Sequence, residues 1–235
     1  MRVCDDQEMF PPEALTFLRG LERNNDRDWF QPRKEIFDTK LKAPMVDLIE
    51  AINAELMDFA PDHVTEPKRA LYRIYRDTRF SNDKTPYKTH IAAIFPRKGL
   101  EKHAGASFYF HLSPKELGIA SGMYMPGPDE LLAVRTMLAE DAPSFRKLIK
   151  GPEKLMGKLH GDAVKRMPKG FDPESPAGDL LKMKQWLYWV ELDSKVATTP
   201  KLKSEIVKRF RAAAPVVERL NSRLKPKAVD PRMLD

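Results

Sequence analysis

Apolar residues recur at helical spacing through residues 1–60 of the chain. After Pro11-Pro12-Glu13, which suits a first helical turn, Leu15, Leu18 and Leu21 follow at intervals of three. Asn24-Asn25-Asp26 breaks this helix. A second helix is predicted over 29–41, and it should end or kink at Ala43-Pro44 because the residue before proline disfavours helical geometry. A third should follow at once, with its apolar stripe at Met45, Leu48, Ile49, Ile52 and Leu56.

From Leu71 onward the apolar positions alternate with a period near two. This alternation predicts five strands, separated by turns rich in Pro, Gly, Asn and Lys, at 71–76, 89–95, 106–112, 117–125 and 185–192. Most of the connections are short. Short connections favour antiparallel pairing, since parallel neighbours need a crossover of about a dozen residues or more.

Two of these strands differ in the character of their faces. In the strand around 107–112, Phe108 and Phe110 share one face, which we expect in the core, and Tyr109 and His111 share the other. The strand at 185–192 is apolar on both faces. We therefore expect both of its faces to be covered. We interpret its aromatic cluster, Trp186, Tyr188 and Trp189, as packing, and the alternative is a surface that stacks a base or ring.

The remaining C-terminal sequence is predicted to be mainly helical. A helix should start at 126–130, whereas 141–183 shows only short helical patches at 145–149 and 180–183 and room for a short strand. Thr198-Thr199-Pro200 should cap a long last helix, bent at Pro215. Its inward positions are predicted to be Leu202, Ile206, Phe210, Val217 and Leu220.

These elements predict an α+β fold. A mainly antiparallel sheet of about five strands should pack against the N-terminal helices and a long C-terminal helix. No linker or internal repeat divides the sequence, so we expect one domain over 1–235, ordered over roughly 10–225.

Composition favours a folded, soluble protein. The 235 residues are 42% hydrophobic and 32% charged, which is too apolar for disorder. No run approaches the roughly 18 apolar residues that a membrane span needs, and the first ten residues lack a signal-like apolar core. We therefore expect a cytoplasmic protein with no membrane partner. Cys4 is the single cysteine, so no intramolecular disulfide is possible.

The net charge of +7 is unevenly distributed along the chain. Residues 1–65 carry −6, residues 66–115 carry +7 and residues 116–235 carry +6. The acidic excess of the first segment lies mostly on predicted helix surfaces. The middle segment is the unusual one, because its charge is concentrated in one stretch of arginine, lysine and tyrosine.

That stretch, 69–88, is the candidate for ligand binding. Arginine and lysine bind carboxylate and phosphate groups, and tyrosine adds stacking surface. The predicted ligand-binding residues are Arg76, Arg79, Lys84, Tyr87, Lys88 and Tyr124. The alternative is a rigid polar corner in which Asp77 and Asp83 pair with the arginines. In a straight strand Arg73 and Arg76 would point to opposite faces, so whether they share a face with Arg79 stays open.

Signals for catalysis, metals and cofactors are weak. His111, on a predicted strand, is the candidate acid–base residue, and the alternative is an ordinary hydrogen-bonded histidine. The five histidines show no metal-ligand spacing, and no nucleotide-binding glycine loop or nucleophile elbow is present. No metal or cofactor is predicted, and whether the protein is an enzyme stays open.

Several motifs together resemble the mainly bacterial family called domain of unknown function 2461. They are Asn24 to Phe30, Arg76 to Lys88, Tyr109 to Leu112, Gly122 to Pro126 and Pro168 to Asp172. The run from Arg76 to Lys88 is the specific one, and the resemblance extends over about residues 10–225. It implies a single-domain cytoplasmic protein and transfers no catalytic residue.

The leading functional hypothesis is a protein that binds a small anionic molecule, bearing phosphate or carboxylate, through the stretch at 76–88, with or without catalysis. One alternative is a nucleic-acid-binding accessory protein that uses this stretch and the basic last helix as one surface. Another is a protein–protein adaptor in which the arginine and tyrosine side chains form the contact patch.

Overall fold

The N-terminal residues form the helical layer that the apolar spacing predicts. In the computed structural model, which describes residues 10–225, α1 (Pro12–Arg23) buries Leu15, Leu18 and Leu21. Cys4 and the C-terminal tail beyond 225 lie outside the described residues. The Asp26 side chain accepts a hydrogen bond from the Trp29 N–H and so caps the next helix.

From Arg27 to Phe59 the chain keeps helical geometry throughout. The elements are α2 (Arg27–Phe30), η1 (Gln31–Arg33), α3 (Lys34–Phe37), the π-helical turn η2 (Asp38–Lys42) and α4 (Ala43–Phe59). Pro44 lies in the first turn of α4, directly after the π-helical turn, in which the Ala43 N–H donates to the Asp38 carbonyl. The change of helix type therefore falls in the turn before the proline. The short elements η3 (Pro61–His63) and α5 (Pro67–Ala70) lead on to the sheet.

The sheet has four strands, all antiparallel, in the order β1-β2-β3-β4. They are β1 (Ile91–Phe95), β2 (Ser107–Leu112), β3 (Glu116–Met123) and β4 (Trp186–Asp193). The α+β class and the antiparallel pairing are confirmed, but the predicted count of about five strands is slightly too high. The segment 71–76 makes only isolated pairings, Leu71 with Ala93 and Tyr75 with Tyr87.

The missing strand has a physical explanation. The Tyr72 N–H donates to the Ala92 carbonyl at 2.9 Å, after which the chain leaves the edge of β1. It then folds back on itself, with Arg76 donating to Pro86 and Lys88 donating to Ile74 through their backbones. Residues 73–88 thus form a protruding two-stranded arm, and their alternation reflects pairing within the arm.

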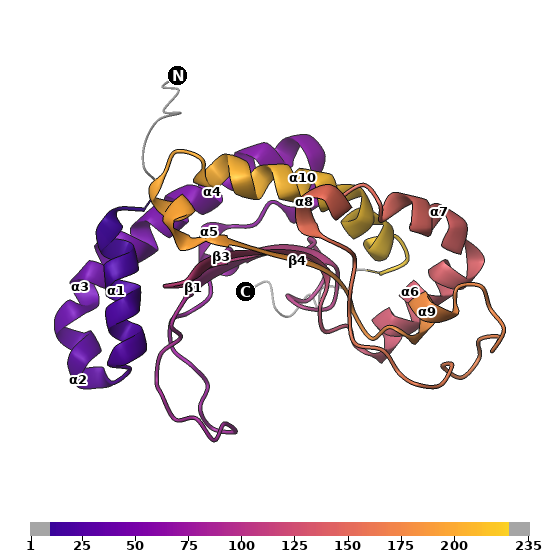
Figure 1. The fold of residues 1–235 in the computed structure, drawn as a ribbon, viewed down its shortest axis with the longest axis horizontal. Coiled ribbons are helices and arrows are strands. Elements are labelled where there is room, and N and C mark those ends of the chain that lie inside the picture. Colours follow the sequence, from indigo (N-terminus) through magenta and orange to yellow (C-terminus); the bar gives the residue numbers. More distant parts are fainter. Residues whose placement is uncertain (1–9, 226–235) are drawn as a thin grey trace, which may run out of the picture.

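One face of the sheet is covered by helices. Figure 1 shows α4 and the long C-terminal α10 (Leu202–Asn221) lying along the same side of the sheet. All five predicted inward positions of α10 are buried, and its Phe210 ring packs against Phe95 and Phe108. Phe110 is also buried on this face, as the alternation predicts.

The opposite face of the sheet is concave and open. It lies between the arm and a lobe that contains α6 (Pro128–Glu140), α7 (Ala142–Leu148) and α9 (Gly178–Lys182), whereas α8 (Glu153–Met156) lies beside α10 on the covered side (Figure 1). The prediction that both faces of β4 are covered is wrong. Trp186 is fully buried on the helix side, whereas Trp189 is 38% exposed because no helix covers the concave side there.

The region 141–183 contains the short helices that its patches indicate, and one of its residues pairs with β4, while a second bridge forms within the region. His160 pairs with Leu187 and Ala163 pairs with Met183 as isolated bridges. After β4, η4 (Ser194–Thr198) leads into α10. Among the described residues, no helix has both the length and the apolar character needed to cross a bilayer.

Candidate functional site

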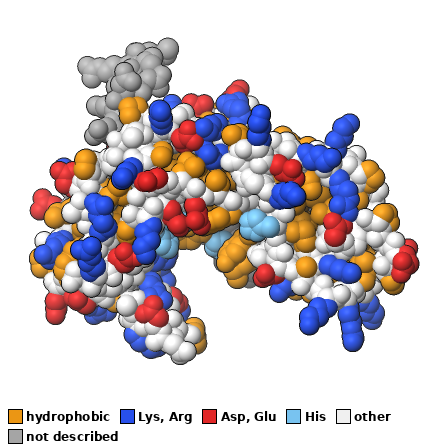
Figure 2. Space-filling view, in the orientation of Figure 1, with side chains coloured by type: hydrophobic (Ala, Val, Ile, Leu, Met, Phe, Trp, Pro, Cys, Tyr) orange, Lys and Arg blue, Asp and Glu red, His pale blue; other side chains and the backbone are white. Residues whose placement is uncertain are grey.

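The concave face holds a cavity of about 380 Å³. It exists because the middle strand β3 presents small residues there. Ala120 lies in register between Tyr109 of β2 and Trp189 of β4, and Gly122 lies between Ser107 and Leu187. Because Ala120 and Gly122 leave the middle of this face without a large side chain, the aromatic residues of the neighbouring strands form walls around an empty centre. Figure 2 shows this underside hollowed between the arm and the lobe, with hydrophobic and histidine side chains gathered in it.

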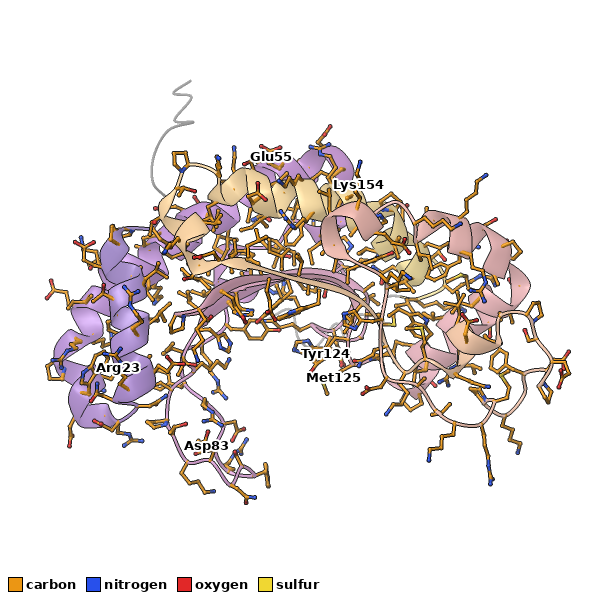
Figure 3. The ribbon with its side chains drawn as sticks, in the orientation of Figure 1. Arg23, Glu55, Asp83, Tyr124, Met125 and Lys154 are labelled. Atoms are coloured by element: carbon orange, nitrogen blue, oxygen red, sulfur yellow. The ribbon has the colours of Figure 1, made fainter. Side chains whose placement is uncertain are left out.

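One wall of the cavity is aromatic. The Tyr109 and Trp189 rings stack with centroids 6.4 Å apart, and Tyr72 meets Tyr109 edge-on at 6.2 Å. Burial raises the pKa of Tyr72 to about 12 and also raises that of Tyr109, so both phenols stay protonated at neutral pH. Tyr124, which follows β3, points into the same hollow (Figure 3). These rings offer flat apolar surface together with neutral hydroxyl donors.

The end of the cavity nearest the arm is cationic. Lys88 Nζ lies 4.9 Å and Lys102 Nζ lies 3.9 Å from the centre of the Tyr72 ring. The His103 Nε2 atom lies 3.4 Å from the Tyr72 hydroxyl. Burial lowers the pKa of both lysines, and neighbouring positive charge lowers it further. Among the described residues that line the cavity there is no aspartate or glutamate.

His90 lies between the cationic end and the sheet. Its pKa falls to about 4, mainly through burial and then through the nearby His111 and Lys88. At neutral pH it is therefore an uncharged imidazole. Its ring is 5.2 Å from that of His111, the candidate acid–base residue.

His111 lies behind the cavity wall, next to Trp189, with ring centroids 5.6 Å apart. Its Nε2 is 3.2 Å from Glu116 Oε1, and within the described part of the chain its buried Nδ1 has no hydrogen-bond partner. The ring covers Gly118, where an added Cβ would come within 2.3 Å of it. Burial lowers the pKa of His111. The His111 ring is thus packed against Trp189 and Gly118, next to the His90 ring.

Only two of the predicted ligand-binding residues line the cavity, Lys88 and Tyr124. In the arm, Arg76 pairs with Asp83 and Thr85, and Arg79 donates to Asp77 at 2.7 and 3.0 Å. Lys84 donates to the Thr78 carbonyl at 2.9 Å. These bonds match the alternative of an internally paired polar corner.

The carboxylates of the arm are strongly engaged in this pairing. The Arg79 guanidinium lowers the pKa of Asp77 to about 2, and the Thr85 N–H together with Arg76 does the same for Asp83. Figure 3 shows Asp83 at the far end of the arm, away from Tyr124. The six predicted side chains therefore do not converge on one concavity.

Tyr87 anchors the arm to the N-terminal helices. It is 1% exposed and stacks on Phe30 with ring centroids 4.1 Å apart. The Asn25 side chain donates to the Tyr87 carbonyl at 2.9 Å and accepts from its N–H at 3.0 Å. Tyr87 is thus a packing residue, while the next residue, Lys88, reaches the cavity.

The sequence prediction omits several residues of the cavity. Tyr109 was on the same predicted face as His111, and that shared face was the usable signal. Trp189 sits opposite Ala120 through a register that no local pattern reveals. Lys102 and His103 come from the loop between β1 and β2, so only the folded chain brings them to Tyr72.

Comparison with known proteins gives a family and no activity. No curated protein matches the chain. The family model described as "Conserved hypothetical protein (DUF2461)" matches residues 13–218, which is most of the sequence and includes the arm, the sheet and the helices that cover it. The chain therefore belongs to the DUF2461 family of conserved hypothetical proteins.

Proposed function

We propose that this protein binds a small, flat, anionic molecule in the cavity on the concave face of its sheet. The observation that carries the proposal is the composition of the cavity: aromatic rings along one wall, Lys88 at one end with Lys102 beside it on the Tyr72 ring, and no carboxylate among its described lining residues. Ligand sites are typically concave and mostly apolar, with a few polar groups that fix orientation.

The volume suits a compact ligand. At about 380 Å³ the cavity lies near the lower end of the usual range for small-molecule sites. The Tyr109 and Trp189 rings would hold a planar group by stacking, and Lys88 would attract an acidic one. The proposal is for binding, and it assigns no catalytic role to His90 or His111.

The nucleic-acid alternative is less well supported. Two basic residues of α10 pair with acidic residues of α4: Lys203 lies 3.4 Å and Arg211 lies 3.7 Å from Glu55. The helix and the arm lie on opposite sides of the sheet (Figure 1), so a single binding surface does not combine them. No residue of α10 or of the outer part of the arm, 77–84, is among the described lining residues of the cavity.

A ligand-observed NMR screen of small aromatic acids and phosphates tests the proposal. Trp189→Ala should weaken binding of the hits by about tenfold, since stacking on an aromatic side chain contributes about 1–3 kcal/mol. Phe80→Ala is the matched control, because Phe80 is 95% exposed on the arm and lies outside the cavity. Hits that bind both variants equally would contradict a cavity site.

A further inference from the structure

Two ammonium groups meet at one ring without a counter-charge. Lys88 and Lys102 both contact Tyr72, and among the described residues neither has a carboxylate partner. Besides the ring, Lys102 Nζ has one hydrogen-bond acceptor, the Arg69 carbonyl at 3.1 Å. Several other basic residues differ: Arg76 and Arg79 of the arm pair with Asp83 and Asp77, and Arg211 of α10 pairs with Glu55 and Asp58.

The Tyr72 ring does not neutralise this charge. A cation–π contact contributes about 0.5–1 kcal/mol at an exposed site and leaves both ammonium groups positive. After burial, the charge of Lys88 is the next cause that lowers the pKa of Lys102, and Lys102 in turn lowers the pKa of His103. The positive groups therefore act on one another, and an anion placed between them would relieve that repulsion.

Resting on the proposed function, we infer that the Lys88–Lys102 end of the cavity is a phosphate subsite and that the ligand is a planar ring compound carrying a phosphomonoester. A phosphomonoester has a charge of about −1.5 to −2 at neutral pH, which matches two ammonium groups, whereas a carboxylate would compensate only one. Its three terminal oxygens can accept from several donors at once.

The donor type also favours phosphate. Arginine presents a planar fork that pairs with a carboxylate through two parallel bonds, and Arg79 of the arm makes such a pair with Asp77. Lysine is a compact point charge with freely rotating donors, which suits the tetrahedral arrangement of phosphate oxygens. Lys88 and His103 line this end of the cavity, Lys102 lies over the Tyr72 ring beside them, and no arginine is among the described lining residues.

The aromatic wall begins where the cationic end stops. Tyr72 belongs to both, because it contacts the two lysines and also meets Tyr109, which stacks on Trp189. A ring attached directly to the phosphate would therefore lie along the Tyr109 and Trp189 side chains. This polarity, cationic at one end and aromatic along the other, defines the orientation of the ligand.

Phenyl phosphate and benzoate are matched probes for this inference, since they share the ring and differ in the anion. Protein-observed NMR titration of the full chain should give phenyl phosphate at least about a tenfold lower Kd than benzoate. Lys88→Ala and Lys102→Ala should each remove that preference. Lys98→Ala removes an exposed lysine of the same loop that neither lines the cavity nor lies over the Tyr72 ring, and it should preserve the preference.

The possible results separate the inference from the proposed function. Benzoate binding as tightly as phenyl phosphate, with affinity still lost in Trp189→Ala, would overturn the phosphate subsite and leave the cavity as a binding site. If neither compound shifts the resonances of Tyr109 and Trp189, both proposals fail. Equal weakening of phenyl phosphate by Lys98→Ala would show attraction by net charge alone and would also overturn the subsite.

Discussion

At the scale of single residues, burial determines which groups around the cavity carry charge. It keeps Tyr72 and Tyr109 protonated and His90 neutral at pH 7. The lysines stay cationic while their pKa values fall, so they are the groups that a ligand would meet as positive charge. Burial lowers the pKa values of His90, His103 and His111, so these three histidines do not add to that charge.

His90 should make the stability of the fold depend on pH. Its pKa in the folded state, about 4, lies below the ordinary value of 6.5. Protons therefore bind the unfolded chain more readily, and stability is lost as the pH falls from about 6.5 toward 4. Between about pH 7 and about pH 5 this single group should account for about 2 kcal/mol of lost unfolding free energy.

The His90→Gln variant should therefore lose less stability than the native sequence over the same pH interval, measured by urea unfolding. The matched control is His160→Gln, which removes an exposed histidine outside the cavity. Parallel pH profiles for His90→Gln and the native protein would contradict this assignment.

At the scale of elements, periodicity predicted the strands and helices well where each buries one face. It located β1 to β4, and the stripe of α10, because burial imposes a period of 2 or 3.6 whatever the partner. It could not distinguish a sheet strand at 71–76 from one side of an arm. In both, apolar and polar residues alternate, and the local sequence does not specify the hydrogen-bond partner.

The same limit explains the predicted site. Charge and aromatic content pointed to 76–88, but those properties do not say whether Arg76 and Arg79 meet a ligand or the aspartates beside them. Lys88 lines the cavity because it lies at the base of the arm, shortly before β1. Apolar residues identify the face of the sheet that the helices cover. Whether the other face is open depends on where the remaining elements pack, which the local sequence does not specify.

The junction between the N-terminal helices and the arm depends on Asn25. Its side-chain amide bonds both backbone groups of Tyr87, so Asn25→Ala leaves two partly buried polar groups unpaired. We expect a loss of about 1–3 kcal/mol in unfolding free energy, measured by denaturant titration. Asn24→Ala is the neighbouring control: Asn24 is exposed and bonds only Gly20, so it should cost less. Equal losses would show that the Tyr87 contact contributes nothing beyond helix capping.

At the scale of the whole molecule, the fold places the acidic N-terminal segment against the basic last helix. The acidic α4 faces the basic α10, where Glu55 and Asp58 pair with Lys203 and Arg211. Much of the basic charge of the last helix is therefore balanced on the covered side of the sheet. In the middle segment, Lys88 and Lys102 lie over the Tyr72 ring, which lines the cavity, and neither makes an ion pair within the described residues.

Shortening the arm tests whether its outer part contributes to ligand binding in the cavity. Its outer part, residues 77–84, bonds within the arm, and Lys88 and Tyr72 lie at its base. Replacing 77–84 by a Gly-Gly turn should therefore leave phenyl phosphate binding within about twofold of the native value, with the unfolding temperature almost unchanged. Binding would be measured by the same NMR titration, with Lys88→Ala as the variant that must lose it. If the shortened protein folds but no longer binds, the outer arm belongs to the site, as the sequence alone suggested, and the ligand must extend beyond the cavity to meet it.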